Sequence, residues 1–345
     1  MTGYQPGEQP ANRTLVKLNT NENPYPPSPW VQAAVERAAN DDLNRYPSPM
    51  TDRLRELAAD RYRVSPEQVL VGNGSDELLA MCLKACAGEG ARVAYATPTY
   101  SLYRTLVDIA CAQACEVIDD GLDERDRPEV WRGLADHDAA VTFVCNPNSP
   151  FGTAVAPSRI GDLAARVNGL VVADEAYVDF GGRSALDLIS RHANLLVVRT
   201  LSKSFSLAGV RIGLAFGDRQ LIGEIAKVKD SYNVSRLAAA AGSAALEDYD
   251  WMARNVERIV ATRHRVVAVV RQAGYRVPQS VANFFWMDCS PGSGKAVYEH
   301  LRANGVLVRY FDVPALRAGV RVTVGTDPEM DRFLVALPPC PPAPR

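Results

Sequence analysis

The chain has 345 residues, of which 47% are hydrophobic and 23% charged, and its formal net charge is −2. This is the composition of a globular protein long enough for one large domain and a smaller one. No block of like charges occurs, which argues against a nucleic-acid-binding or membrane-surface protein. No apolar run approaches the roughly 20 residues that a membrane helix needs.

The seven cysteines contain no C-x-x-C pair, and their odd number favours a reducing cytoplasm. The pairs Cys82/Cys86 and Cys111/Cys115 have no accompanying histidine, so we expect buried small side chains there and no metal site. The beginning of the chain, "MTGYQPGEQPANR", holds no apolar stretch, so no secretory signal is expected.

The first 30 residues are rich in Pro and Asn, and we expect them to be irregular. Helical patterns follow over residues 30–41 and 50–62, and short apolar runs then alternate with amphipathic segments. The apolar runs occupy residues 68–71, 92–96, 139–144, 169–173, 194–198 and 212–216. This alternation predicts an α/β fold with a mostly parallel sheet covered by helices.

A long helical stretch over residues 231–272 precedes a second pattern. Strands are expected at 283–288, 305–311 and 319–325, with a helix at 294–305 between the first two. We therefore predict a large domain over residues 40–240, and a smaller α+β domain built from residues 1–39 and 241–345. The proline-rich end "PPCPPAPR" is expected to be disordered.

Five of the apolar runs end in short polar segments. In open parallel sheets, ligands bind outside the carboxyl ends of the strands, so these segments should gather along one edge as a site. In chain order they read "GNGSDE", "TPTY", "CNPNSPFG", "DEAY" and "RTLSK".

The segment "GNGSDE" begins a helix and suits a phosphate. Gly74 lets the backbone approach a ligand closely, and the amides of Ser75 and Asp76 would be free at the helix N-terminus. The alternative is an ordinary helix cap. Arg211 and Ser202 would add a cation and a hydroxyl near the same edge, which is enough to anchor a dianion.

Asp174 ends a strongly apolar run, where a half-buried carboxylate needs a cationic partner such as a protonated ring nitrogen; the alternative is a helix or turn cap. Tyr177 could reach the same ligand with its hydroxyl. Tyr100 offers a ring face for stacking or, alternatively, packs in the core. Lys203, at a strand end near the anchor and the acid, can lose its proton and attack an aldehyde. Together these groups describe a pyridoxal-phosphate site.

The chain resembles the fold-type-I pyridoxal-phosphate aminotransferases and, within them, the histidinol-phosphate aminotransferases. The resemblance extends from residue 21 to residue 328 and implies a seven-stranded, mostly parallel sheet in the large domain beside a smaller α+β domain. Its most specific segments are "NENPYPPSP", "GNGSDE", "VVADEAYVDF", "TLSKSFSLAGVRIG", "KVKDSYNVSR" and "VLVRYF…VRVTVGT".

The resemblance implies a role for each cofactor residue. Lys203 would bind the cofactor aldehyde covalently and move protons, Asp174 would keep the ring nitrogen protonated, and Tyr177 would bond the ring hydroxyl. Tyr100 would stack on the ring. The cofactor phosphate would be held by Gly74, Ser75, Asp76, Ser202 and Arg211.

The resemblance also implies a homodimer, in which Tyr46 reaches the cofactor phosphate in the neighbouring subunit's site. Tyr25, Arg309 and Arg321 would bind the anionic end of the substrate. Without the resemblance, the alternation in "VRVTV" predicts that Arg321 lies on a solvated strand face.

One motif departs from the family pattern. The family often has an asparagine directly before Pro-Thr-Gly, where it contacts the ring hydroxyl. Here the stretch is "NPNSPFG", with Ser149 in that place and Phe151 instead of threonine. We expect either Asn148 or Ser149 to make the contact.

The implied reaction is a ping-pong transamination between glutamate or 2-oxoglutarate and histidinol phosphate or imidazole acetol phosphate, in histidine biosynthesis. Aminotransferases of aromatic amino acids or specialised metabolites, and a threonine-phosphate decarboxylase, are alternatives on the same scaffold, because pocket shape decides the substrate. The intact lysine and acid argue against a non-enzymatic cofactor-binding module. A nucleotide-binding loop is disfavoured because G-x-x-x-x-G-K-[ST] is absent.

Overall fold

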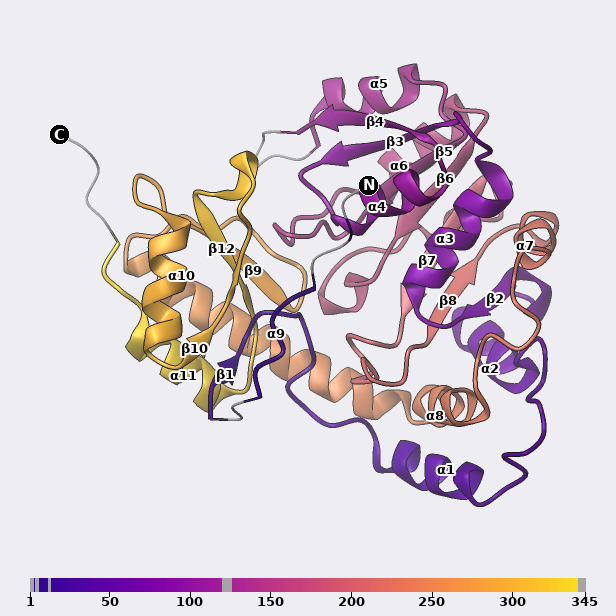
Figure 1. The fold of residues 1–345 in the computed structure, drawn as a ribbon, viewed down its shortest axis with the longest axis horizontal. Helices are drawn as coiled ribbons and strands as arrows, with labels where there is room; N and C mark the ends of the chain where they lie inside the picture. Colours follow the sequence, from indigo (N-terminus) through magenta and orange to yellow (C-terminus); the bar gives the residue numbers. More distant parts are fainter. Residues whose placement is uncertain (1–2, 4–5, 12–13, 120–125, 341–345) are drawn as a thin grey trace.

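The computed structural model describes residues 3, 6–11, 14–119 and 126–340. Its largest element is a seven-stranded sheet in which β8 alone runs antiparallel to its neighbours (Figure 1). The predicted α/β class with a mostly parallel sheet is therefore confirmed. From edge to edge the strands are β2 (Val69–Gly72), β8 (Gly213–Phe216), β7 (Leu195–Thr200), β6 (Leu170–Asp174), β5 (Val141–Cys145), β3 (Arg92–Thr97) and β4 (Gln113–Ile118).

Each of the six predicted apolar runs overlaps one strand of this sheet, whereas β4 has no such run. The residues of β4, "QACEVI", are all exposed or half-buried, because the strand lies at the sheet edge. The segment is therefore too short and too polar to be recognised as an apolar run.

Helices cover both faces of the sheet, because successive strand residues point to opposite sides. Val71 belongs to the apolar cluster under one layer of helices, and its neighbour Leu70 belongs to the cluster under the other. The first layer comprises α1 (Pro29–Ala39), α2 (Asp52–Tyr62), α5 (Pro128–Asp136), α6 (Pro157–Arg166) and α8 (Arg236–Glu247). The second comprises α3 (Ser75–Cys86), α4 (Leu102–Ile109) and α7 (Arg219–Ala226).

A smaller unit has its own apolar cluster around a three-stranded antiparallel sheet, with the order β11-β12-β9. A parallel pair, β1 with β10, lies beside it and ties the N-terminal segment to this unit. The elements are β1 (Val16–Lys17), β9 (Phe284–Asp288), α10 (Gly294–Ala303), β10 (Val306–Leu307), β11 (Arg309–Tyr310), β12 (Gly319–Thr323) and α11 (Asp327–Ala336).

The single strand expected over residues 305–311 is wrong. The chain forms β10 and β11 on either side of Val308, and the two pair with different partners. A continuous apolar run cannot reveal such a change of partner, because both halves are equally suited to a strand.

The long helix α9 (Tyr249–Gln272) joins the two units (Figure 1). Met252 near its start packs in the cluster of the large sheet, while Ile259 and Val266 pack in the cluster of the smaller unit. Helix α1 also packs against α8, which in turn packs against α2, and all three share the apolar cluster of the large sheet. We propose on this basis that the chain crosses between the units before α1 and again within α9.

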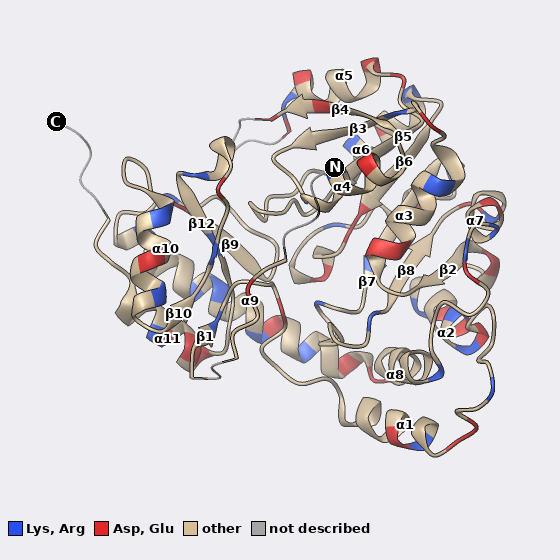
Figure 2. Cartoon of the chain, in the orientation of Figure 1, with Lys and Arg blue, Asp and Glu red and all other residues tan. Residues whose placement is uncertain are grey.

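The charged residues of both signs are interspersed, for example along α1, α2 and α10 (Figure 2). Over the part of the chain that the structure describes, no helix is both long and apolar enough to span a membrane. All seven cysteines are free. Cys82 is buried but Cys111 is exposed at the end of α4, so the expectation of burial is wrong for Cys111. Of the predicted disordered end, residues 341–345 lie outside the described residues.

Candidate active site

The polar segments after the strands line one pocket together with parts of the N-terminal segment and the smaller unit. The strands β2, β3, β5, β6 and β7 all end there, so the topology gathers residues that are far apart in the chain, such as Asp76 and Arg211, which are 135 positions apart. Eleven of the predicted residues line the pocket: Ser75, Asp76, Tyr100, Ser149, Asp174, Tyr177, Ser202, Lys203, Arg211, Arg309 from β11 and Arg321 from β12.

The start of α3 forms the anion-binding end of the pocket. Gly74 has a φ of +86°, and a Cβ there would lie 2.6 Å from Arg211 Nη2. Arg211 donates to Ser202 Oγ at 3.2 Å and to Asp76 Oδ2 at 3.1 Å. Free amides at the first turn of α3, with a guanidinium and a hydroxyl beside them, suit a phosphate.

Asp174 lies buried at the end of β6, where Tyr103 Oη donates to Oδ2 at 2.8 Å and the Ala176 amide donates to Oδ1 at 3.3 Å. Burial raises the pKa of Asp174 to about 6, although both hydrogen bonds oppose the rise. Among the described residues, neither a lysine nor an arginine forms an ion pair with this carboxylate. A planar cation bound in the pocket would supply the missing charge.

Lys203 lies in the loop after β7, which is held from two sides. Asn23 Nδ2 donates to the carbonyls of Lys203 and Ser204 at 3.0 and 3.1 Å, and Ser204 Oγ donates to Asp179 at 2.6 Å. Burial lowers the pKa of Lys203 to about 8, and the charge of Arg321 acts in the same direction. The amine is therefore poised to give up its proton near neutral pH.

The two tyrosines predicted for the cofactor both lie in the pocket. Tyr100 Oη donates to Asp76 Oδ1 at 3.1 Å. Tyr177 packs edge-on against Phe284, with ring centroids 4.9 Å apart, and its hydroxyl accepts a hydrogen bond from Asn21 Nδ2 at 3.0 Å.

Of the two residues expected at the ring hydroxyl, the structure brings Ser149 to the pocket. Asn148 lines an adjacent cavity and donates to the Pro98 carbonyl at 3.3 Å. Ser149 Oγ accepts a hydrogen bond from Arg321 Nη1 at 3.1 Å.

Arg309 and Arg321 are directly opposite each other in the antiparallel ladder of β11 and β12. Arg321 also donates to the Asn19 carbonyl at 3.0 Å, and Arg309 donates to the Pro6 carbonyl at 3.1 Å. Like charges that face each other across strands repel, so this pair favours a bound anion. The solvated strand face that alternation predicted for Arg321 is wrong, because the smaller unit turns this face toward the pocket.

Four predicted residues do not line the pocket of this single chain: Gly74 and Asn148, described above, and Tyr25 and Tyr46. Tyr25 is buried in the cluster of the smaller unit, with the Arg258 guanidinium 3.6 Å from its ring centroid. Tyr46 is 77% exposed and stacks on Tyr232, with centroids 4.3 Å apart.

Tyr103 and Asn21 are the functional candidates that sequence reasoning missed. Tyr103 follows "TPTY" on α4, and nothing local marks it, because its contact with Asp174 depends on how α4 packs under the sheet. Asn21 lies in "NENPYPPSP", which was singled out as a segment but without a role for this residue.

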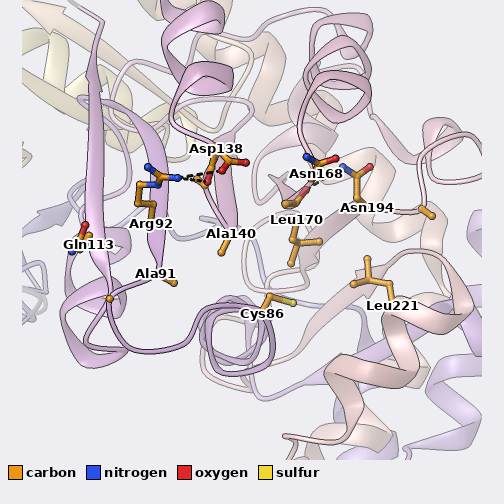
Figure 3. Close-up of a pocket in the computed structure, with 14 residues that line it drawn as sticks. Cys86, Ala91, Arg92, Gln113, Asp138, Ala140, Asn168, Leu170, Asn194 and Leu221 are labelled. Atoms are coloured by element: carbon orange, nitrogen blue, oxygen red, sulfur yellow. Dashed lines mark hydrogen bonds and ion pairs between the residues drawn. The ribbon is translucent and has the colours of Figure 1, made fainter.

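A wider surface hollow of about 980 Å³ lies at the opposite, amino-terminal ends of β3, β5 and β6 (Figure 3). Its charged groups already pair, with Arg92 Nη2 3.2 Å from Asp138 Oδ2. Asn194 Nδ2 donates to three backbone carbonyls. Among the described residues that line it, this hollow has no lysine, histidine or tyrosine, so it lacks the convergent reactive groups of the other edge.

Comparisons with known proteins agree with this site. Residues 13–337 match the family model "Aminotransferase class I and II". The chain is 42% identical over 339 residues to the histidinol-phosphate aminotransferase of Citrifermentans bemidjiense, covering 98% of this chain and 95% of the relative. It is 41% identical to histidinol-phosphate aminotransferase 1 of a Nostoc species, with coverage of 98% and 95%.

Among solved structures, the chain is similar to the histidinol-phosphate aminotransferase from Sinorhizobium meliloti in complex with pyridoxal-5'-phosphate. The TM-score is 0.86 at 26% identity, covering 93% of this chain and 89% of the other. The fold-type-I architecture implied by the sequence resemblance is thereby confirmed.

Proposed function

This chain belongs to the class I and II aminotransferase family, and on that premise we propose that it transfers an amino group between glutamate and imidazole acetol phosphate. The products are 2-oxoglutarate and histidinol phosphate, and the reaction is a step of histidine biosynthesis. Pyridoxal phosphate is the cofactor. The observation that carries the substrate assignment is the opposed pair Arg309 and Arg321 at the pocket, which calls for an anionic substrate end.

The residues of the pocket fit this cofactor. The buried carboxylate of Asp174 suits a ring N–H cation, and the start of α3 with Arg211 and Ser202 suits the phosphate. Gly74 leaves open the space beside Arg211 that a side chain would fill. Lys203 lines the same pocket between these two ends.

Bound pyridoxal phosphate supplies an aldehyde that takes up amino groups and a protonated ring that withdraws electrons from the substrate carbon. Lys203 supplies the amine that holds the aldehyde, and it then moves a proton at Nζ as general base and acid. Its pKa of about 8 leaves part of the amine unprotonated near neutral pH, which this role requires.

Asp174 would hold a proton on the ring nitrogen of the bound cofactor. Tyr103 Oη and the Ala176 amide occupy the carboxylate from two sides and fix its orientation. Ionisation of Asp174, which burial disfavours, becomes favourable once the ring cation lies beside it.

Arg321 and Arg309 bind the phosphate of the substrate, and hydrogen bonds to Ser149 Oγ and the Asn19 carbonyl orient the guanidinium of Arg321. Phe284 and Phe311 lie 5.3 and 5.5 Å from its centre and shield it from water.

We also propose that the enzyme is a homodimer, with the exposed Tyr46 of each chain reaching the site of the other. We place it in the cytoplasm, which agrees with its seven free cysteines.

The test is the visible spectrum of the purified protein during titration with histidinol phosphate, phenylalanine, glutamate and threonine phosphate in parallel. The band of Lys203-bound cofactor should bleach with glutamate and at low concentrations of histidinol phosphate, and much less readily with phenylalanine. If phenylalanine alone bleached the band, the protein would still be an aminotransferase, but the proposed substrate would be wrong.

The matched variant is Lys203→Ala. It should retain some cofactor noncovalently, lack the covalent band, and lose turnover by at least about a thousandfold. Full activity in this variant would overturn the mechanism.

A further inference from the structure

A buried cluster behind Tyr177 joins segments that are far apart in the chain. The Asn21 clamp consists of Asn21 in the N-terminal segment, Thr323 on β12, Asn283 before β9, and Tyr177 after β6. The Asn21 amide donates to Thr323 Oγ1 at 3.0 Å, and that hydroxyl donates to Asn21 Oδ1 at 3.1 Å. Asn283 Nδ2 donates to the Asn21 carbonyl at 2.9 Å.

With the bond from its Nδ2 to Tyr177, each of the four polar atoms of Asn21 makes a hydrogen bond. Its φ of +55° lies in the left-handed region, which asparagine tolerates better than most residues. A buried side chain with every group satisfied is held in one orientation, and this one points at a single atom, Tyr177 Oη.

The direction of that bond decides what Tyr177 can do. A phenol oxygen that accepts a hydrogen bond from an amide directs its own proton elsewhere and becomes a stronger donor. Phe284 fixes the plane of the Tyr177 ring, and Tyr177 lines the pocket with Lys203 Nζ 5.9 Å from its ring centroid. For the residues that the structure describes, no acceptor of this hydroxyl proton is recorded.

We propose that Asn21 is a positioning residue that directs the Tyr177 hydroxyl proton at the ring oxygen of the cofactor, and that Thr323 holds Asn21 in place for this task. The inference rests on the proposed function, because the acceptor belongs to pyridoxal phosphate. It links the docking of β12, and hence of the smaller unit, to the electronic state of the cofactor.

The experiment measures the pH midpoint of the visible band of Lys203-bound cofactor in the holoenzyme. The variants are Asn21→Gly, which tolerates the left-handed backbone, Tyr177→Phe, and the double variant. A donor at the ring oxygen stabilises the deprotonated form, so Asn21→Gly should raise the midpoint by about 0.5 to 1 pH unit, a change of about three- to tenfold in proton affinity. Thr323→Val should give a smaller shift of the same sign.

The Tyr177→Phe background separates positioning from general loosening of the fold. If Asn21 acts through Tyr177, Asn21→Gly should cause no further shift there. An equal shift in both backgrounds would overturn the proposal. The control is Arg63→Gly, an exposed residue with a φ of +57° far from the pocket, which should leave the midpoint unchanged.

A double-mutant cycle with Asn21→Gly and Tyr177→Phe in the cofactor-free protein measures stability by urea unfolding. A direct Asn21–Tyr177 bond predicts that the two substitutions destabilise non-additively, whereas additive losses would overturn the contact itself. The outcomes are distinguishable, because absence of any visible band in the parent protein would contradict the proposed function, while an unchanged midpoint in Asn21→Gly would contradict only this inference.

Discussion

In the mechanism that we propose, Asp174 is unfavourable for the cofactor-free protein and necessary for the cofactor-bound one. Its carboxyl is fully enclosed, and burial moves its pKa from 3.8 to about 6. Because this pKa is higher in the folded chain than in the unfolded chain, folding favours the protonated form. The contribution to stability is complete below pH 3.8 and is lost as the pH rises through 6.

We therefore predict that Asp174→Asn makes the cofactor-free protein relatively more stable as the pH rises. Its free energy of unfolding, compared with the parent, should gain up to about 3 kcal/mol between pH 4 and pH 7. Urea denaturation of both proteins across this range measures the effect. With pyridoxal phosphate bound, the parent should instead be the more stable of the two proteins at pH 7. A difference in stability that does not change with pH would contradict a raised pKa of Asp174 in the folded protein.

At the scale of single elements, the first turn of α3 depends on Gly74. A φ of +86° strains any other residue, and an added Cβ would also displace Arg211. Gly90 offers a matched control, since its φ is +73° and nothing lies within 4 Å of an added Cβ.

We expect Gly74→Ala and Gly90→Ala to destabilise the cofactor-free protein by a similar amount, about 1 kcal/mol. Only Gly74→Ala should also weaken the binding of pyridoxal phosphate, by at least about tenfold, because the hydrogen bonds of Arg211 to the cofactor phosphate are lost. Cofactor titration beside urea denaturation separates the two effects. Equal losses of cofactor affinity in both variants would show that the position of Arg211 is unimportant.

The ladder of β11 and β12 places Arg309 and Arg321 in register, and we propose that this pair binds the substrate phosphate. Arg321→Gln should lower kcat/KM for histidinol phosphate by about 10- to 100-fold while changing cofactor affinity little. Arg309→Gln should do less, because the hydrogen bond of Arg309 to the Pro6 carbonyl is exposed to solvent, whereas the hydrogen bonds of Arg321 are part-buried. Steady-state kinetics with unphosphorylated histidinol is the control, and a loss as large with that substrate would rule out a phosphate contact.

At the scale of the whole molecule, the role implied for Tyr46 cannot be fulfilled within a single chain. Tyr46 is exposed, stacks on Tyr232 and does not line the pocket of its own chain. Its implied role in binding the cofactor phosphate therefore requires a second copy of the chain. Closed twofold assembly would supply that copy and would place each Tyr46 equivalently.

Mixing two inactive variants tests this arrangement. Lys203→Ala and Tyr46→Ala chains, after subunit exchange, should recover roughly a quarter of the parent activity, because one site of each mixed dimer holds both intact residues. Lys203→Ala mixed with Asp174→Asn should recover nothing, since both residues serve the pocket of their own chain. Failure of the first mixture, with the dimer verified by sedimentation, would remove Tyr46 from the neighbouring site.

By itself, the sequence determined the mostly parallel sheet and the edge where the chemistry lies. Apolar runs, and the polar segments that end them, are local patterns, and the topology of a parallel sheet brings such ends together. Ser75, Asp174, Lys203 and Arg211 could be predicted for this reason.

Only the tertiary structure decided which distant side chains meet. The bond from Tyr103 to Asp174, the Asn21 clamp, the entry of Ser149 rather than Asn148, and the change of partner at Val308 all depend on packing between segments far apart in the chain. A local pattern reports how a residue is buried and how the chain turns, but not which side chain lies against it, because that contact is set by how whole elements pack.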